Sequence, residues 1–122
     1  MMTPIGRRRT PARTSGRIVP RRGEVWLARL DKTRPVIILS RDPMGAYLNA
    51  VLAVPITRTI RNITTEVPVG PTDGVRYQSV ANLDNLQPVY QDELLERVGR
   101  ARPETLAAVC RALAFAVDCE ST

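Results

Sequence analysis

The sequence predicts a mainly β protein of the α+β class, in which a small barrel of five or six strands precedes one C-terminal α-helix. At 122 residues the chain is long enough to bury one hydrophobic core without disulfides or metals. Short apolar runs divided by turn residues occupy most of the chain, which is typical of small barrels and sandwiches. Only near the end do apolar residues recur at helical spacing.

Six short runs have the composition of β-strands. Two of them, at 35–40 and 49–56, are almost continuously apolar, as expected for buried strands. Pro68 marks the run at 65–70 as an edge strand, because proline cannot donate to a ladder. The turn GPTDG (70–74) follows that run. The expected strands are EVWLARL (24–30), PVIILS (35–40), NAVLAVPI (49–56), TEVPVG (65–70), YQSVANL (77–83) and ERVGRA (96–101).

The segment RPETLAAVCRALAFAV (102–117) has the signals of an α-helix that plugs or flanks the barrel. Pro103 suits a first helical turn, and the adjacent Glu104 suits the positive end of the helix dipole. Apolar residues at helical spacing predict one buried face. The residues expected on that face are Leu106, Val109, Cys110, Leu113 and Val117.

The basic charge of the chain is confined to its N-terminal tail. The formal net charge is +6, but residues 1–22 contain seven arginines and no acidic residue. The remainder carries 11 basic and 12 acidic residues, so it is close to neutral. We expect a disordered, Arg-rich tail over 1–20 and one folded domain over 21–120. The tail is interpreted either as an arm that attracts RNA nonspecifically or as a dispensable leader.

Histidine is absent and only two cysteines occur, which removes the commonest acid–base group and the commonest metal ligands. On one helix Cys110 and Cys119 would lie roughly 13 Å apart, too far for a disulfide. Cys110 is expected to be buried. No run approaches the ~20 apolar residues of a membrane span, and no apolar signal segment follows the N-terminal arginines. The sequence therefore predicts a cytoplasmic protein without a metal or another cofactor.

Arg34 is the first candidate for a functional residue, because it directly precedes Pro35 and an apolar run. A residue before proline is driven toward extended geometry, and proline itself is tolerated at the start or edge of a strand. The Arg34 guanidinium should therefore be fixed at the lip of a buried strand. A planar fork of donors in that place suits the oxygens of a phosphate.

Four segments form a pattern that extends over most of the folded part of the chain. They are RRGEVWLARLDKTRPVIILS (21–40), AVPIT (53–57), GVRYQSVANLDNLQPV (74–89) and ERVGRARPETLAAVCRAL (96–113). In order and spacing they resemble the MazF/PemK/Kid-type toxins of type II toxin–antitoxin systems. Each segment alone is weak, since proline-initiated apolar strands are common, but four in order make a specific match.

The resemblance implies an SH3-like barrel, a homodimer, and sequence-specific cleavage of single-stranded RNA without a metal. The implied reaction is attack of a ribose 2′-hydroxyl on the adjacent phosphate, which leaves a 2′,3′-cyclic phosphate and a 5′-hydroxyl. The substrate class can be mRNA, rRNA or tRNA. The implied partner is a cognate antitoxin with an acidic, disordered segment that blocks the site.

The same resemblance implies that Arg34 and Thr57 are catalytic. The high pKa of arginine makes it a poor general acid, so Arg34 is expected to act electrostatically. Some family members read R-C-D where this chain reads RYQ (76–78), so Gln78 replaces a carboxylate and cannot accept a proton. The residues expected to bind or orient RNA are Arg76, Gln78, Ser79, Thr59, Arg58, Arg41 and Tyr77.

Two features leave the mechanism open. Glu24 and Asp42 are the candidate proton acceptors. The segment DKT (31–33) is shorter than the loop usual in the family, which predicts a more open groove. An alternative is a non-catalytic toxin or regulator of the same fold that binds a protein such as gyrase. The R-P and P-I-T pairs favour the nuclease, whereas Gln78 favours the alternative.

Overall fold

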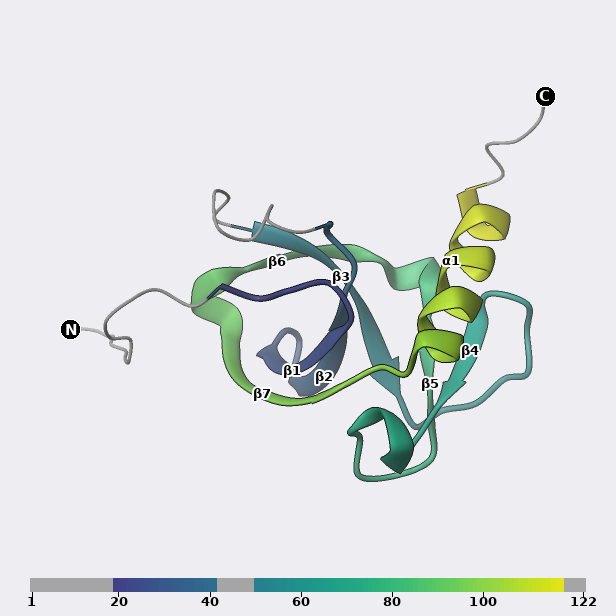
Figure 1. Cartoon of the computed structure of the whole chain (residues 1–122), viewed down its shortest axis with the longest axis horizontal. Helices are drawn as coiled ribbons and strands as arrows, with labels where there is room; N and C mark the ends of the chain where they lie inside the picture. The colour runs from purple at the N-terminus through teal and green to yellow at the C-terminus, as the bar shows by residue number, and fades with distance from the viewer. Residues whose placement is uncertain (1–18, 42–49, 118–122) are drawn as a thin grey trace.

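We describe the protein from a computed structural model, which covers residues 19–41 and 50–117 (Figure 1). Apart from Val19 and Pro20, the tail expected at 1–20 lies outside the described residues, as do Asp42 and Cys119. In the described ranges no helix is both long enough and apolar enough to span a membrane.

Seven strands form one antiparallel sheet in the order β4-β5-β3-β2-β1-β7, with β6 paired to β3. All six expected strands are present, with shifted ends. The strand β6 was missed, because a four-residue segment containing Pro88 is atypical of a strand. The strands are β1 (Glu24–Arg29), β2 (Thr33–Ile38), β3 (Ala50–Thr57), β4 (Glu66–Val69), β5 (Ser79–Asn82), β6 (Gln87–Tyr90) and β7 (Leu94–Arg100). Short 3-10 helices between them are η3 (Pro71–Asp73), η4 (Leu83–Asn85) and η5 (Gln91–Glu93).

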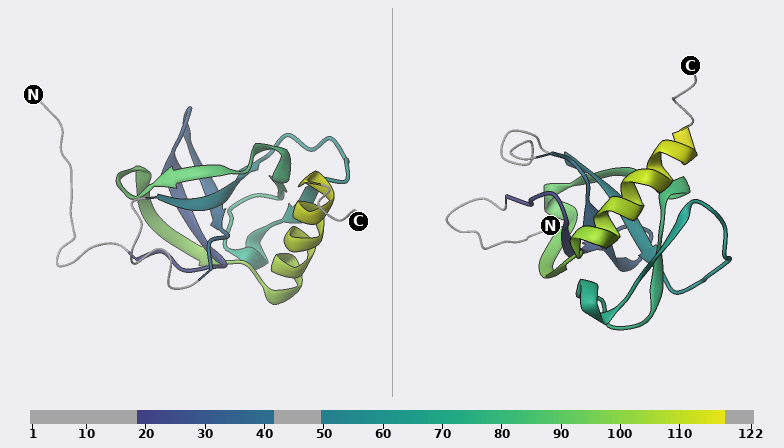
Figure 2. Two further views of the ribbon diagram at one scale, coloured as in Figure 1. Left: turned by 90° about the horizontal axis from the view of Figure 1, so that it is seen from above. Right: turned by 45° about the vertical axis from the view of Figure 1, so that its right-hand side comes forward.

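The sheet curls because its ends are joined by a short stretch of chain. β6 pairs with β3 and β7 pairs with β1, yet only η5 separates β6 from β7. The five strands β6-β3-β2-β1-β7 therefore wrap into a barrel-like arrangement, while β4 and β5 extend to one side beneath the helix (Figures 1 and 2). As expected, β4, which contains Pro68, lies at an edge of the sheet.

Strand β3 changes partner along one of its edges. Ala50–Ala53 pair with β6, and Ile56 and Thr57 pair with β5. Val54 and Pro55 have no strand partner on that edge, although they pair with β2 on the other. Pro55 lacks an N–H group, so a position without a ladder on one edge suits it. The sheet is therefore forked here, in the sense that β6 and β5 diverge from the same edge of β3.

The central strands bury both faces, which explains the continuous apolar run of β2. Val36 and Ile38 belong to one apolar cluster, whereas Ile37 and the following Leu39 belong to the other. The first cluster fills the barrel-like part and includes Trp26, which is 9% exposed and thus a core residue as expected. The second cluster lies between the sheet and the helix.

The helix α1 (Pro103–Val117) flanks the sheet and packs against β4 and η4. The prediction of its buried face was partly wrong: Cys110 and Val117 are exposed. The face turned to the sheet is centred on Val109, where the small side chains of Thr105 and Ala112 allow close packing. Thr105 and Ala112 give a weak hydrophobic signal, so the sequence pattern placed the buried face of α1 too far toward Cys110 and Val117. Leu106 and Leu113 lie half-buried at its margin.

Glu24 fastens the start of β1 to β7. Its buried carboxylate accepts hydrogen bonds from the backbone N–H of Arg21 (2.9 Å), from Trp26 Nε1 (3.0 Å) and from Arg97 Nη1 (3.1 Å). Burial alone would raise the pKa of Glu24, but these donors outweigh burial and hold that pKa below its ordinary value. The carboxylate is fully engaged in holding the sheet together.

Asp73 anchors the start of the helix α1 in a similar way, through a buried carboxylate. Its side chain is fully buried and accepts hydrogen bonds from the backbone N–H of Arg102 (2.9 Å), from Arg102 Nε (3.2 Å) and from the backbone N–H of Gly70 (3.3 Å). Burial tends to raise the pKa of Asp73, but the donors from Arg102 and Thr105 lower it overall. Asp73 thereby ties η3 to the residue that leads into α1.

The substitution Asp73→Asn should destabilise the fold in a pH-dependent way. At neutral pH we expect a loss of about 2–3 kcal/mol in the free energy of unfolding, because charge-assisted hydrogen bonds are lost in a buried place. The pKa of Asp73 is lowered on folding, so its contribution is complete above the ordinary value of 3.8 and disappears as the pH falls through the folded-state value.

Urea unfolding at several pH values checks this prediction, with the exposed Asp92→Asn as the control. The difference between wild type and Asp73→Asn should shrink in acid. A difference that is constant from neutral pH into acid would contradict the role assigned to the Asp73 charge.

Candidate functional site

Arg34 on β2 and Thr57 on β3 line the same pocket. The paired register of the two strands ends at Val36 and Pro55, each two residues away from Arg34 and Thr57 respectively. Alternate residues of a strand share a face, so both side chains lie on the same side of the sheet. On β1, the partner of Arg34 is the fully buried Ala28. The two residues implied to be catalytic are thus brought together.

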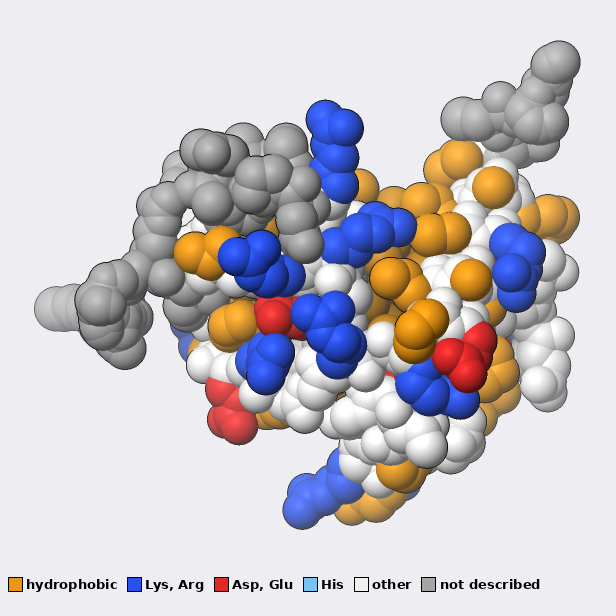
Figure 3. Space-filling model, viewed as in Figure 1, with side chains coloured by type: hydrophobic (Ala, Val, Ile, Leu, Met, Phe, Trp, Pro, Cys, Tyr) orange, Lys and Arg blue, Asp and Glu red, His pale blue; other side chains and the backbone are white. Residues whose placement is uncertain are grey.

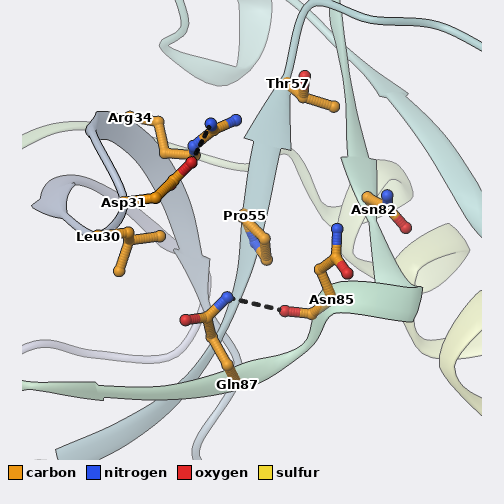
Figure 4. Close-up of a pocket in the computed structure, with 8 residues that line it drawn as sticks. All are labelled: Leu30, Asp31, Arg34, Pro55, Thr57, Asn82, Asn85 and Gln87. Atoms are coloured by element: carbon orange, nitrogen blue, oxygen red, sulfur yellow. Dashed lines mark hydrogen bonds and ion pairs between the residues drawn. The ribbon is translucent and has the colours of Figure 1, made fainter.

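A pocket of about 310 Å³ opens at this place (Figure 4). It lies at the fork of the sheet, where β3 leaves β6 for β5 and where η4 crosses from one to the other. Its floor is Pro55, one of the two β3 residues that have no strand partner on that edge. The residues that line it are Leu30, Asp31, Arg34, Pro55, Thr57, Asn82, Asn85 and Gln87.

Asp31 holds the Arg34 guanidinium, a contact that the sequence analysis missed. Arg34 Nη2 lies 3.2 Å from Asp31 Oδ2, and the Arg34 side chain is only 20% exposed, against 74% for Asp31. The short DKT segment causes this contact, because the tight β1–β2 hairpin sets two residues three apart side by side.

The charge state of Asp31 follows from the same contact. Desolvation tends to raise the pKa of Asp31, but the Lys32 backbone N–H and the Arg34 guanidinium outweigh it, so the pKa lies below its ordinary value. A carboxylate with a lowered pKa is a weak base, which suits an orienting role better than proton transfer.

Thr57 ends β3 with its hydroxyl held in place. The backbone N–H of Thr59 donates to Thr57 Oγ1 at 3.2 Å, so the oxygen accepts from the protein while its own proton remains available for a ligand. Thr59, expected to contact RNA, is exposed and does not line the pocket. Its backbone N–H contacts a residue of the pocket, Thr57.

Four other predicted residues gather in a second pocket of about 450 Å³. Pro35 and Ile56 line it, so it lies on the opposite face of β2 and β3 from Arg34 and Thr57. Arg58 Cζ lies 4.2 Å from the centroid of the Tyr77 ring, and the Tyr77 side chain is half-exposed. The predicted RNA-binding residues that line this pocket are Arg58, Arg76, Tyr77 and Ser79.

Two glycines determine how closely the segment carrying Arg76 and Tyr77 approaches β7. Gly74 has a φ of +93°, and a Cβ on it would come within 2.6 Å of the Gly99 Cα. A Cβ on Gly99 would meet the Gly74 Cα at 2.5 Å. Only glycine at both positions permits this contact. The contact sets the distance between β7 and the segment with Arg76 and Tyr77, both of which line the second pocket.

The structure separates the remaining candidates from the Arg34 pocket. Gln78 is exposed and lines a different recess beside Pro68. Arg41 is exposed where the described chain breaks off after β2, and Asp42 lies outside the described residues. Glu24, proposed from the sequence as a proton acceptor, forms the β1–β7 clamp and does not line the pocket.

Basic side chains on the face shown in Figure 3 surround a few acidic ones. Within the fold, the guanidinium groups of Arg97 and Arg100 lie 3.1 and 3.8 Å from the Glu24 carboxylate. One buried carboxylate thus pairs with two of the described arginines. In the described ranges no three His, Cys, Asp or Glu side chains are grouped so that they could hold a metal ion.

The family of PemK-like, MazF-like toxins of type II toxin–antitoxin systems matches residues 21–117. The chain belongs to this family. A relative, the probable endoribonuclease MazF5 of Mycobacterium tuberculosis, is 39% identical over 104 residues, which are 83% of this chain and 95% of the relative.

Solved structures of MazF-family proteins have the same fold. The M. tuberculosis toxin MazF-mt6 has a TM-score of 0.76 at 35% identity, covering 80% of this chain and 99% of the toxin. A mycobacterial endoribonuclease in complex with its cognate antitoxin also has a TM-score of 0.76, at 33% identity, covering 84% of this chain and 99% of that protein. The expected family, fold and enzyme class are confirmed: the chain is a MazF-family endoribonuclease toxin.

Removing the charge of Asp31 should alter RNA affinity more than cleavage. In Asp31→Asn we expect RNA to bind roughly two- to fivefold more tightly, because an exposed ion pair is weak and its acidic partner repels phosphate. Fluorescence anisotropy with a labelled RNA measures affinity, and single-turnover cleavage measures the rate.

Asp92→Asn, which removes the same charge from η5, is the control for long-range electrostatics. If Asp31→Asn cleaved RNA more than about tenfold more slowly while still binding it, Asp31 would take part in the chemistry.

Proposed function

We propose that Arg34 and Thr57 act together on the scissile phosphate of a single-stranded RNA. The observation that carries this proposal is their juxtaposition across β2 and β3 at the mouth of a pocket. Both present hydrogen-bond donors, and Arg34 adds a permanent positive charge. Such a pair is complementary to the non-bridging oxygens of a phosphate, on which negative charge grows during attack.

The proposed reaction is transesterification within the RNA. The ribose 2′-oxygen forms a bond to phosphorus while the bond from phosphorus to the 5′-oxygen breaks. The 2′-hydroxyl gives up its proton, the 5′-oxygen takes one up, and the products carry a 2′,3′-cyclic phosphate and a 5′-hydroxyl. Arg34 and Thr57 lower the barrier by donating hydrogen bonds to the pentavalent phosphorus centre. The chain's own residues perform the proposed chemistry without a metal or another cofactor.

We assign the transfer of protons to neither Glu24 nor Asp31. Glu24 is buried among three donors, outside the Arg34 pocket, and the lowered pKa of Asp31 disfavours it as a base. Asp42 remains a sequence prediction for the proton acceptor. Asp31 is a positioning residue, which holds the guanidinium until a phosphate replaces the carboxylate as its partner.

The second pocket is proposed to hold flanking nucleotides. Tyr77 is half-exposed, and an aromatic ring of this kind can stack on a base of single-stranded RNA. Arg58 and Arg76 lie beside that ring, where they can contact phosphates. Arg41, Ser79, Gln78 and Thr59 are proposed as lesser contributors, the last through Thr57.

The proposed partners follow from the family. A mycobacterial relative was solved with its cognate antitoxin, so we propose that an antitoxin with an acidic, disordered segment covers the Arg34 pocket of this chain. We also propose a cytoplasmic homodimer, with mRNA, rRNA or tRNA as the substrate.

The decisive variants are Arg34→Ala and Thr57→Ala. Each should slow cleavage by about 10²–10³-fold at saturating RNA, because each removes a donor that faces developing charge. Cleavage of an RNA oligonucleotide pool with EDTA present, with mass spectrometry of the product ends, measures both the rate and the chemistry.

Arg111→Ala, which removes an exposed arginine from α1, is the matched control and should cleave at the wild-type rate. Full activity in Arg34→Ala would contradict the assignment. If wild-type protein cleaved nothing and still arrested growth, a toxin that binds a protein such as gyrase would replace the nuclease.

A further inference from the structure

Three neutral amides line the Arg34 pocket on the side opposite the guanidinium. In Figure 4 Asn82 and Asn85 lie across Pro55 from Arg34, Asp31 and Leu30. Gln87 forms the lower end of the pocket and donates from Nε2 to the Asn85 carbonyl oxygen at 3.1 Å. The pocket is therefore charged at one side, apolar on its floor and neutral but polar at the other side.

Asn82 is the amide whose position is fixed. It is the last residue of β5 and is 4% exposed. Its Oδ1 accepts a hydrogen bond from the backbone N–H of Asp84 at 3.0 Å, as the cap of η4. The Asp84 N–H needs an acceptor, so this hydrogen bond fixes the orientation of the amide: Oδ1 faces Asp84, and Nδ2 is the remaining polar atom.

The Asn82 Nδ2 group has no hydrogen-bond acceptor among the residues that the structure describes. A buried donor without a partner costs about 1–3 kcal/mol, so folded proteins keep only a few of them. Here the unpaired donor belongs to a side chain that lines the proposed catalytic pocket. An acceptor supplied by the ligand would satisfy it.

We propose that Asn82 reads the base of a nucleotide that flanks the cleaved phosphate. This inference rests on the proposed function of Arg34 and Thr57. The volume of about 310 Å³ is at the small end for ligand sites and suits a single nucleotide. The phosphate lies at Arg34, the sugar and the base lie over Pro55, and the edge of the base meets Asn82. A base suits this wall better than a second phosphate, because its three amides carry no charge.

The orientation of the amide predicts what kind of base is chosen. With Oδ1 engaged by the Asp84 N–H, the unpaired group of Asn82 is the Nδ2 donor, so it favours a base that presents an acceptor at that point. A carbonyl oxygen, as in uracil or guanine, is accepted there, and the exocyclic amino group of adenine or cytosine is rejected. Asn82 is thus a specificity-determining residue for cleavage.

Two substitutions separate base reading from a merely structural role. Asn82→Asp keeps the oxygen that caps η4 but replaces the donor with an acceptor. Asn82→Ser keeps a capping oxygen and adds no charge, and it replaces the amide donor with the hydroxyl of a shorter side chain, which reaches less far into the pocket. Thermal unfolding of both variants verifies that the fold is retained.

The experiment is cleavage of a randomised RNA pool by wild type and both variants, with sequencing of the product ends. At one position flanking the cut, Asn82→Asp should change the preference from a carbonyl to an amino base by about tenfold or more, and Asn82→Ser should relax the preference. An unchanged base preference at both flanking positions, or an equal loss of rate for every sequence, would overturn the proposal.

The two proposals can fail separately. The Arg34→Ala variant, with and without Asn82→Asp, is used to select bound RNA from the same pool. A difference in the selected base supports base reading by Asn82 even if cleavage does not depend on Arg34. If Arg34→Ala abolishes cleavage but Asn82→Asp leaves both the cleaved and the bound sequences unchanged, only the base-reading proposal is wrong.

Discussion

Strand β3 pairs with β6 through its first half and with β5 through its end, and the site depends on the interval between them. In that interval Val54 and Pro55 have no partner on one edge, so the sheet opens. A proline suits this place because it has no donor to lose. The opening gives a ligand access to Arg34 and Thr57, which line the same pocket.

Glu24 and Asp73, two of the three carboxylates buried in the described residues, keep this forked sheet from separating. Glu24 fixes β1 to β7. The other neighbour of β1 in the sheet is β2, the strand that carries Arg34. Asp73 fixes η3 to the start of α1, which in turn covers β4 and η4. Since η4 carries one wall of the pocket, the helix supports the amides that face Arg34. Glu24, a candidate proton acceptor in the sequence, is thus part of the scaffold.

The strand pattern and the family could be predicted from the sequence, because apolar runs, turn residues and four ordered segments carry that information. The buried face of α1 could not, because Thr105 and Ala112 are small and give a weak hydrophobic signal. Arg34 could be proposed from the sequence because the R-P pair constrains the backbone locally. Its contact with Asp31 was missed, although it lies only three residues away, because a hairpin had to bring the two together.

The amide wall was missed for a different reason. Asn82 ends a buried strand, where Asn is unfavourable, and that mismatch was the available signal. Which pocket it would face depends on the turn of η4 and on the change of partner in β3, and neither is visible in a sequence pattern. Arg58, Arg76 and Tyr77, expected from the sequence to bind or orient RNA, lie in a pocket on the opposite face of the strands from Arg34.

The assignment of the reaction to the Arg34 pocket is tested by an NMR titration of isotope-labelled protein with a short RNA. This RNA lacks the 2′-hydroxyl at its cleavage position, so it binds without being cut. The account predicts that the Arg34 Nε–H, the Thr57 methyl group and the Asn82 Nδ2 signals shift together and saturate at one RNA concentration. Shifts confined to Arg58, Arg76 and Tyr77, with Arg34 and Thr57 unmoved, would contradict it and would transfer the active site to the opposite face of β2 and β3.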